Sequence, residues 1–194
     1  MSDISILRSM SWDQALHCFA TAYVAGQRAR SLERKLRFLE FTGIAMPLLV
    51  GATAAAFGLQ SKAVVALLAV ASIVGIGQLL GSLWALISRW QDSFAAARES
   101  QVTNGRLFEQ YRRLGRNPPA AIHDAEVQLD LLDSENNYQA AIDARMAITD
   151  EEKRMGMRAA LRELQRGCAS CKKVPSDMMA TQCGVCGNFK SRRI

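Results

Sequence analysis

The residues best suited to chemistry in this sequence are four cysteines near its C-terminus. Cys168 and Cys171 form one Cys-x-x-Cys pair, and Cys183 and Cys186 form a second pair eleven residues later. Two tight turns at this spacing can present four thiolates tetrahedrally around one zinc ion. Because protein ligands would occupy all four positions and leave none for water, the pattern predicts a closed, structural zinc site.

Other chemistry is compatible with the same four cysteines. They could form two disulfides, a redox pair or an iron–sulfur cluster, although disulfides are rare in a reducing cytoplasm. Gly184 and Gly187 favour the zinc interpretation, since turns around such ligand pairs often need backbone conformations that glycine tolerates. Cys18 lies far away among apolar residues, so we expect a small buried side chain and assign it no function.

Basic residues surround the predicted zinc module, namely Lys172, Lys173, Lys190, Arg192 and Arg193. They could contact nucleic acid or a membrane surface, or form only a solvated edge. Nucleic acid is not the expected partner, because no aromatic stacking platform and no recognition helix accompanies these residues. An enzyme is not expected either, since there is no phosphate-binding glycine loop and His17 and His123 are isolated. The acidic residues within 124–133 are interpreted as a solvated helix face.

The elements that would position this module are helices, and two of them are long and apolar. Residues 41–59 carry no charge, and residues 63–87 form a second uncharged segment. At about 1.5 Å per residue, each segment can cross a hydrocarbon layer of about 30 Å. Only Gln60, Ser61 and Lys62 separate them, so we expect an antiparallel hairpin of two transmembrane helices.

Positive charges predict the orientation of this hairpin. Residues 21–40 hold five Lys or Arg residues, the intervening turn holds one, and residues 88–116 hold six. Positively charged flanks stay on the cytoplasmic side, so we expect a multi-pass protein of the bacterial inner membrane with both termini in the cytoplasm. The alternative is a soluble protein with two buried helices, but such helices seldom run twenty-five residues without a charge.

The whole chain is therefore expected to be an all-α membrane protein. Its four predicted parts are an N-terminal amphipathic cytoplasmic helix over residues 1–40, the hairpin over 41–87, a cytoplasmic helical region over 88–166 and a small zinc-binding module over 167–194.

Local signals predict where the helices begin and end. Ser11–Gln14 has the form of a capping box and predicts a helix start, and Thr149–Glu152 predicts the start of the last helix in the same way. Glycine and paired prolines within 115–119 predict a break. No such signal lies near Arg89, so the second membrane helix is expected to continue beyond it into the cytoplasm.

Small residues in the second membrane segment predict close helix packing. Gly77 and Gly81 form a small-xxx-small pair, and Gly51 and Ala55 of the first segment could supply the opposing surface. This pair could serve either the hairpin itself or the assembly of an oligomer.

A second stripe of the same segment is small or polar. It consists of Ala71, Gly75, Gln78, Ser82, Ala85 and Arg89, which recur at helical spacing. Such a stripe could line a water-filled pore, or it could pack against another helix. Gln78 is its sharpest element, because an amide near the middle of a membrane needs a hydrogen-bonding partner from another helix or a water-filled cavity.

The combination of a charged N-terminal helix, a membrane hairpin, cytoplasmic helices and the Cys168–Cys186 pattern resembles the bacterial SLATT family of two-transmembrane effectors, in its mobile-element variant with a C-terminal zinc ribbon. The resemblance covers essentially the whole chain, with the cysteine spacing as its specific motif. It implies an effector in conflict between bacteria and phages or plasmids, which oligomerises and compromises the inner membrane when a cytoplasmic sensor or signal releases it.

Two helices per subunit cannot enclose an aqueous path, so this activity would require a homo-oligomer in membrane lipid. The rival hypothesis is a membrane-tethered zinc-ribbon adaptor or nucleic-acid-binding protein whose hairpin is only an anchor. A third is a holin-like protein that acts without any partner.

Overall fold

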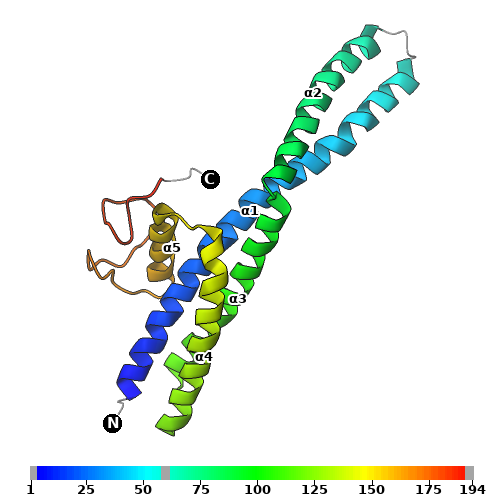
Figure 1. Ribbon diagram of the computed structural model, residues 1–194. Coiled ribbons are helices and arrows are strands. Elements are labelled where there is room, and N and C mark those ends of the chain that lie inside the picture. Colours follow the sequence, from blue (N-terminus) through cyan, green and yellow to red (C-terminus); the bar gives the residue numbers. More distant parts are fainter. Residues whose placement is uncertain (1–3, 58–61, 191–194) are drawn as a thin grey trace. The chain divides into compact units, whose positions relative to one another are not determined.

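The computed structural model describes residues 4–57 and 62–190, and every regular element in those ranges is a helix (Figure 1). The elements are α1 (Ile4–Phe57), α2 (Lys62–Ile87), α3 (Trp90–Arg116), α4 (Ile122–Asp143), the 3-10 helix η1 (Ala144–Met146) and α5 (Asp150–Glu163). The all-helical prediction is confirmed for this part of the chain. The predicted turn at Gln60 and Ser61 lies outside the described residues.

The chain divides into two compact units. We call Met1–Arg28 together with Ala96–Ile194 the helical unit, and Ala29–Ala95 the hairpin unit. Each is described by itself below.

The core of the helical unit lies between α1, α3 and α4. Leu107 and Tyr111 of α3 are fully buried, and they pack with Cys18 of α1 and with Ala125 and Leu129 of α4. The Tyr111 hydroxyl donates a hydrogen bond of 2.7 Å to an Asp133 carboxylate oxygen, so its polar end is satisfied at the edge of the core. These three helices provide the platform on which the rest of the unit packs.

Helix α5 packs against α1 at an unusually close approach. A Cβ atom added to Gly156 would lie 2.6 Å from the backbone oxygen of Ala20 and 2.8 Å from a methyl carbon of Val24. Ala160 and Leu161 of α5 bury their side chains in the same contact. Only glycine at position 156 allows this packing.

An ion pair fixes the start of α5. The Arg28 guanidinium donates to both carboxylate oxygens of Glu152, at 2.9 and 2.6 Å, and to the carbonyl oxygens of Met146 and Ala147. Thr149 caps the helix, and the capping box with Glu152 is present as the sequence predicts. Hydrogen bonds from Arg28 lower the pKa of the Glu152 carboxyl to about 2.

The predicted start of the first helix at Ser11 is wrong. Helix α1 begins at Ile4, and the hydroxyl of Ser11 donates to the carbonyl oxygen of Leu7 inside the helix. A serine in a helix interior can form this bond one turn back, so Ser11–Gln14 does not act as a cap here. The Gly115–Pro119 break is confirmed, since α3 ends at Arg116 and α4 begins at Ile122.

The second apolar helix does not continue past Arg89. It ends at Ile87, and Arg89 adopts a left-handed backbone conformation with φ of 51° before α3 begins at Trp90. The Arg89 guanidinium donates to Asp92 at 2.9 Å, which stabilises the first turn of α3. The sequence holds no glycine or proline at this break, which explains why sequence patterns predicted continuity.

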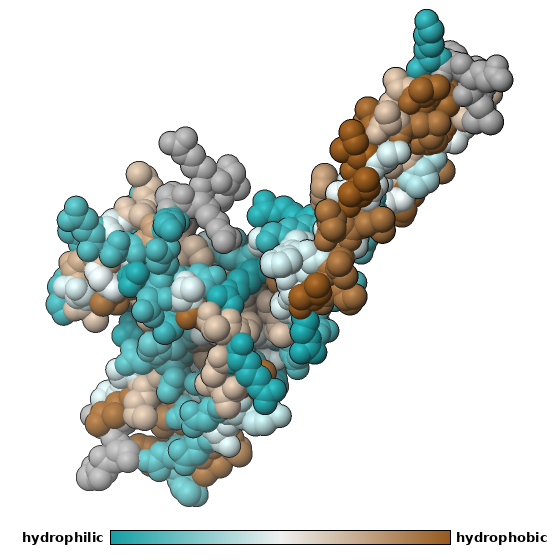
Figure 2. Space-filling model, turned by 45° about the horizontal axis from the view of Figure 1, so that its top comes forward, coloured by the Kyte–Doolittle hydropathy of each residue, from teal (hydrophilic) through white to brown (hydrophobic). Residues whose placement is uncertain are grey.

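The hairpin unit exposes most of its apolar side chains. Both α1 and α2 contain a window long and apolar enough to cross a membrane, with mean hydropathies of 1.5 and 2.3, and almost none of either window is buried. Large side chains such as Phe41, Leu48, Ile73 and Leu79 are 66–73% exposed. In Figure 2 most of the hairpin surface in view is hydrophobic, unlike the surface of the helical unit.

We predict that Gly156→Ala destabilises the helical unit by about 1 to 3 kcal/mol, because the added methyl group would overlap the α1 backbone. The midpoint of thermal unfolding measures this. Gly105→Ala is the matched control, since a Cβ atom there meets nothing within 4 Å in the interior of α3. That control should leave the midpoint unchanged or raise it slightly.

We also predict a pH dependence from Glu152. A carboxyl whose pKa falls on folding stabilises the protein above its unfolded pKa of about 4.5, and this contribution is lost as the pH falls towards 2. Glu152→Gln should therefore lower stability by about 1 to 3 kcal/mol at pH 7 and progressively less between pH 4.5 and 2. Glu151→Gln, at the exposed neighbouring position, should not change this pH profile.

Candidate functional site

The four cysteines predicted to bind metal lie together in the helical unit. Their sulfur atoms all lie within 4.8 Å of one another. The Sγ atoms of Cys168 and Cys183 are 3.9 Å apart, and those of Cys171 and Cys186 are 3.7 Å apart. Cys168 and Cys186 are buried, whereas Cys171 and Cys183 are half-buried.

These distances fit zinc and exclude disulfides. A tetrahedral site with Zn–S bonds of about 2.3 Å places its sulfur atoms about 3.8 Å apart, whereas a disulfide requires about 2.05 Å. Each sulfur belongs to a free cysteine. Cys168, Cys171, Cys183 and Cys186 therefore form a structural zinc site with four protein ligands.

Each of the two Cys-x-x-Cys turns is closed by the same type of backbone hydrogen bond, from the amide four residues after the first cysteine to the carbonyl of that cysteine. In the first, the Lys172 amide donates to the Cys168 carbonyl at 2.9 Å, and in the second, the Gly187 amide donates to the Cys183 carbonyl at 3.0 Å. No strand accompanies these turns within residues 167–190, so the described part of the module is built from turns instead of a β-ribbon.

Gly184 and Gly187 were predicted to supply backbone conformations that other residues avoid, and this prediction is wrong. The left-handed residues near the turns are Lys172, with φ of 60°, and Asn188, with φ of 51°. Gly187 is needed for another reason, because a Cβ atom there would collide with the side chain and backbone of Thr181. A Cβ atom on Gly184 would meet nothing within 4 Å.

The surroundings of the sulfur atoms favour a bound cation. The backbone N–H groups of Cys186 and Val185 lower the pKa of the Cys183 thiol to about 6. Burial raises the pKa of the Cys186 thiol, so its thiolate is costly without a neighbouring positive charge. A dication at the centre of the four sulfurs offsets that cost.

Arg158 of α5 holds the second Cys-x-x-Cys turn and the segment between the two turns, and sequence reasoning missed it. Arg158 is 6% exposed, and its guanidinium donates to the Cys186 carbonyl at 3.3 Å, to the Asp177 carbonyl at 2.9 Å and to the Asp177 carboxylate at 3.0 Å. Arg154, one turn earlier, donates to the Asn188 carbonyl at 3.0 Å. The metal site is therefore part of the packed unit, because Cys168 and Cys186 belong to the same buried cluster as Leu16 of α1 and Leu161 of α5.

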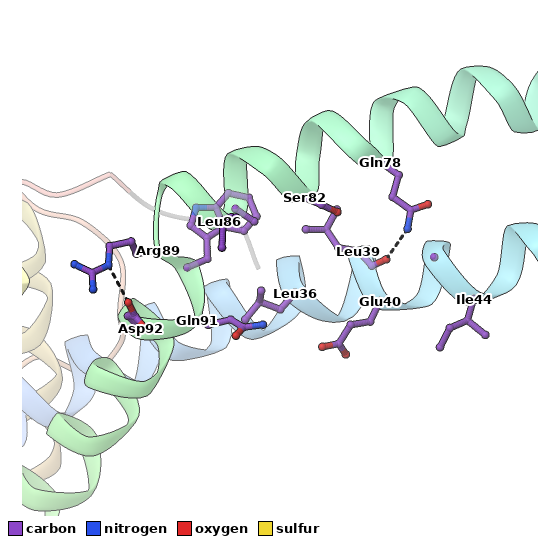
Figure 3. Close-up of a pocket in the computed structure, with 13 residues that line it drawn as sticks. Leu36, Leu39, Glu40, Ile44, Gln78, Ser82, Leu86, Arg89, Gln91 and Asp92 are labelled. Atoms are coloured by element: carbon purple, nitrogen blue, oxygen red, sulfur yellow. Dashed lines mark hydrogen bonds and ion pairs between the residues drawn. The ribbon is translucent and has the colours of Figure 1, made fainter.

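The polar stripe of α2 contributes to a cavity within the hairpin unit. The cavity measures about 630 Å³, and Gln78, Ser82, Ala85 and Arg89 line it from α2 and the break that follows. The Gln78 amide donates to the Leu39 carbonyl of α1 at 3.5 Å (Figure 3). The partner that this amide needs is thus supplied by the neighbouring helix of the same hairpin.

The two helices of the hairpin approach each other at Gly43 and Gly81. The sequence predicted a role for Gly81 but not for Gly43. A Cβ atom on Gly43 would lie 2.5 Å from the Gln78 amide nitrogen, and one on Gly81 would lie 3.3 Å from Leu39. No atom of the described residues lies within 4 Å of a Cβ added to Gly51 or Gly77, so these two glycines do not provide the close approach in the described part of the hairpin. The same is true of Gly75.

The remaining cysteine has a purely structural environment. Cys18 is buried in the α1–α3–α4 core and donates to the Asn136 side-chain oxygen at 3.5 Å. Burial, followed by the charges of Asp133 and Asp143, raises the pKa of its thiol to about 12. It is therefore a protonated, unreactive thiol.

We predict that Cys168→Ser lowers bound zinc from about one ion per chain to well below that value, because it removes one of four ligands. Elemental analysis of the purified full chain measures the metal. Cys18→Ser, at a cysteine of similar burial outside the cluster, should retain the full zinc content. Equal zinc in both variants would contradict the four-cysteine site.

Comparisons with known proteins agree with this assignment. A model of a family described as "Mobilome CxxCx(11)CxxC protein" matches residues 8–189 of this chain. Comparisons with curated proteins and with solved structures find no significant match. The family match extends over the helices, the hairpin and all four zinc ligands, and so the chain belongs to the mobilome CxxCx(11)CxxC family.

Proposed function

We propose that this protein is an effector of the bacterial inner membrane that acts in conflict with phages or mobile elements. In this proposal the hairpin spans the membrane, both termini lie in the cytoplasm, and several copies assemble and permeabilise the bilayer on activation. The mobile-element family is consistent with this setting. The finer resemblance to the SLATT family of two-transmembrane effectors is part of the same proposal.

The observation that carries the proposal is the uncovered apolar surface of the hairpin unit. Side chains such as Ile44, Leu80 and Ile87 are 63–66% exposed on helices with almost no buried apolar window. A core helix of a soluble protein would bury this surface, whereas hydrocarbon solvates it without cost. Membrane insertion therefore explains why the surface is not packed.

The polar groups inside the hairpin could exchange their partners when the protein passes from a resting state to an assembled state. Among the residues that the structure describes, Gln78 has one long hydrogen bond, to Leu39, and Glu40 and Ser82 also line the cavity beside it. In an assembly of several hairpins these groups would instead face neighbouring subunits or water. A buried amide provides specificity for such an exchange, because each state must satisfy it.

The cytoplasmic parts would respond to a sensor or partner and transmit its signal. The zinc module is packed on α5 through Arg158, and α5 is packed on α1 at Gly156. A partner that binds the module would therefore act on the same helix that enters the hairpin. Zinc has a structural role in this scheme and supplies no chemistry.

Gln78→Leu should abolish membrane depolarisation in bacteria after induced expression, because the polar group is removed from the hairpin interior. A voltage-sensitive dye measures the effect, at matched amounts of protein in the membrane fraction. Ser72→Ala is the control, since the Ser72 hydroxyl donates to the Leu68 carbonyl of its own helix, at 2.8 Å. That variant should depolarise cells like the unchanged chain.

No depolarisation by the unchanged chain, even under phage challenge, would contradict the pore-forming effector. The adaptor hypothesis would then apply, in which an unrelated hairpin can replace residues 41–87 and Cys168→Ser removes the activity. Depolarisation without any partner in a heterologous host would instead indicate a constitutive, holin-like protein.

A further inference from the structure

Helix α4 carries a second apolar face that the core of the helical unit does not use. Its buried face contributes Ala125 and Leu129 to the core. On the opposite side, Val127, Leu131 and Tyr138 are 44%, 66% and 71% exposed. With 3.6 residues per turn, their spacing places these three side chains in one narrow stripe along the helix.

The spacing of this stripe is that of a helix–helix interface. Ser134, also exposed, completes a 4-3-4 pattern with the three apolar residues. Such a pattern is the seam along which two helices pack as a short coiled coil. We call Val127, Leu131, Ser134 and Tyr138 the α4 seam.

We propose that the α4 seam binds the α4 seam of a second copy of this chain, with the two helices antiparallel across a twofold axis. In this register Val127 lies against Tyr138 of the second copy, and Leu131 lies against Ser134 of the second copy. The twofold axis repeats each contact in reverse, as an isologous interface requires. Six large apolar side chains then leave water together.

The polar residues beside the seam select the antiparallel arrangement. Asp130 comes to lie next to Asn137 of the second copy, and Gln128 next to Glu135, so each carboxylate meets an amide donor. In a parallel pair, Asp130 would instead lie beside Glu135 of the second copy, which already pairs with Arg106 of its own chain, and Asp130 would lose its amide donor. Gln128, Asp130 and Asn137 are exposed, and Glu135 is half-buried in an ion pair with Arg106 of α3 that leaves its second carboxylate oxygen for Gln128.

The charges at the two ends of the seam also favour this direction. Residues 122–143 contain no Lys or Arg, whereas Arg145 follows directly in η1. Arg145 and Asp124 are both exposed, and neither forms an ion pair with any residue that the structure describes. An antiparallel pair brings the Arg145 end of one helix to the Asp124 end of the other.

The seam is short, so its contact alone is weak. Anchoring both copies in one membrane offsets this weakness. One face of a single helix buries less than the roughly 800 Å² per partner of a typical stable complex. Copies held in one membrane by their hairpins have a much higher effective concentration than copies in solution. In this respect the inference rests on the proposed function, and it supplies the contact through which two hairpins are brought together.

The test is photo-cross-linking of the full chain in bacterial membranes, with benzoylphenylalanine in place of Tyr138. Irradiation should produce a species of about twice the 21.3 kDa monomer. After cleavage at Asp and Glu, which separates positions 127 and 138, mass spectrometry should place the cross-link in the peptide that contains Val127. Leu131→Glu should reduce this species about tenfold or more, since it places a carboxylate in the seam. Val102→Glu is the control, because Val102 is 63% exposed on α3 and lies outside the seam.

Three outcomes would overturn the inference: no dimer, a cross-link between the two 138 positions as in a parallel pair, or a cross-link to a different protein. Fractionation of the same cells separates this result from the proposed function. A chain that resides in the membrane and depolarises cells but forms no α4 cross-link would refute the seam alone. A chain that cross-links through α4 but stays in the soluble fraction would refute the membrane effector and retain the seam.

Discussion

Helix α1 must remove its apolar surface from water along its whole length, and the other helices and the zinc site are built around this helix. Up to Arg28 this helix belongs to the helical unit, where its apolar side chains pack against α3, α4 and α5. From Ala29 onwards it belongs to the hairpin unit, where side chains such as Phe41 and Leu48 are 66–69% exposed. The apolar side chains in the first half of this helix are therefore covered by other helices of the protein. We propose that those in the second half are covered by lipid.

The zinc site depends on the same packing. A module of fewer than thirty residues without a strand in its described part has too little apolar surface to fold alone, so the metal and the contact with α5 must supply the missing stability. Arg158 makes this contact specific, because one guanidinium donates to the Asp177 carbonyl between the two turns and to the Cys186 carbonyl of the second turn. Gly156 makes it possible, because α5 can approach α1 only without a side chain there.

The sequence predicted the features that depend on local pattern and missed those that depend on tertiary contact. The four zinc ligands follow from their spacing, and the two apolar helices follow from length and hydropathy. The break at Arg89 was missed, because nothing in the neighbouring sequence requires a left-handed residue there. Gly43, Gly156 and Arg158 gave no signal either, since each matters only through a residue far away in the chain. Ser11 shows the opposite error, in which a local pattern matched but the helix had already begun.

In the proposed topology the hairpin spans the inner membrane and both termini lie in the cytoplasm. We would test this first by alkaline extraction of membranes together with reporters fused to each end of the chain. We expect the protein to stay in the membrane pellet, green fluorescent protein to fluoresce at either terminus, and alkaline phosphatase to be inactive at both. Release into the alkaline supernatant, or an active phosphatase at either terminus, would contradict it.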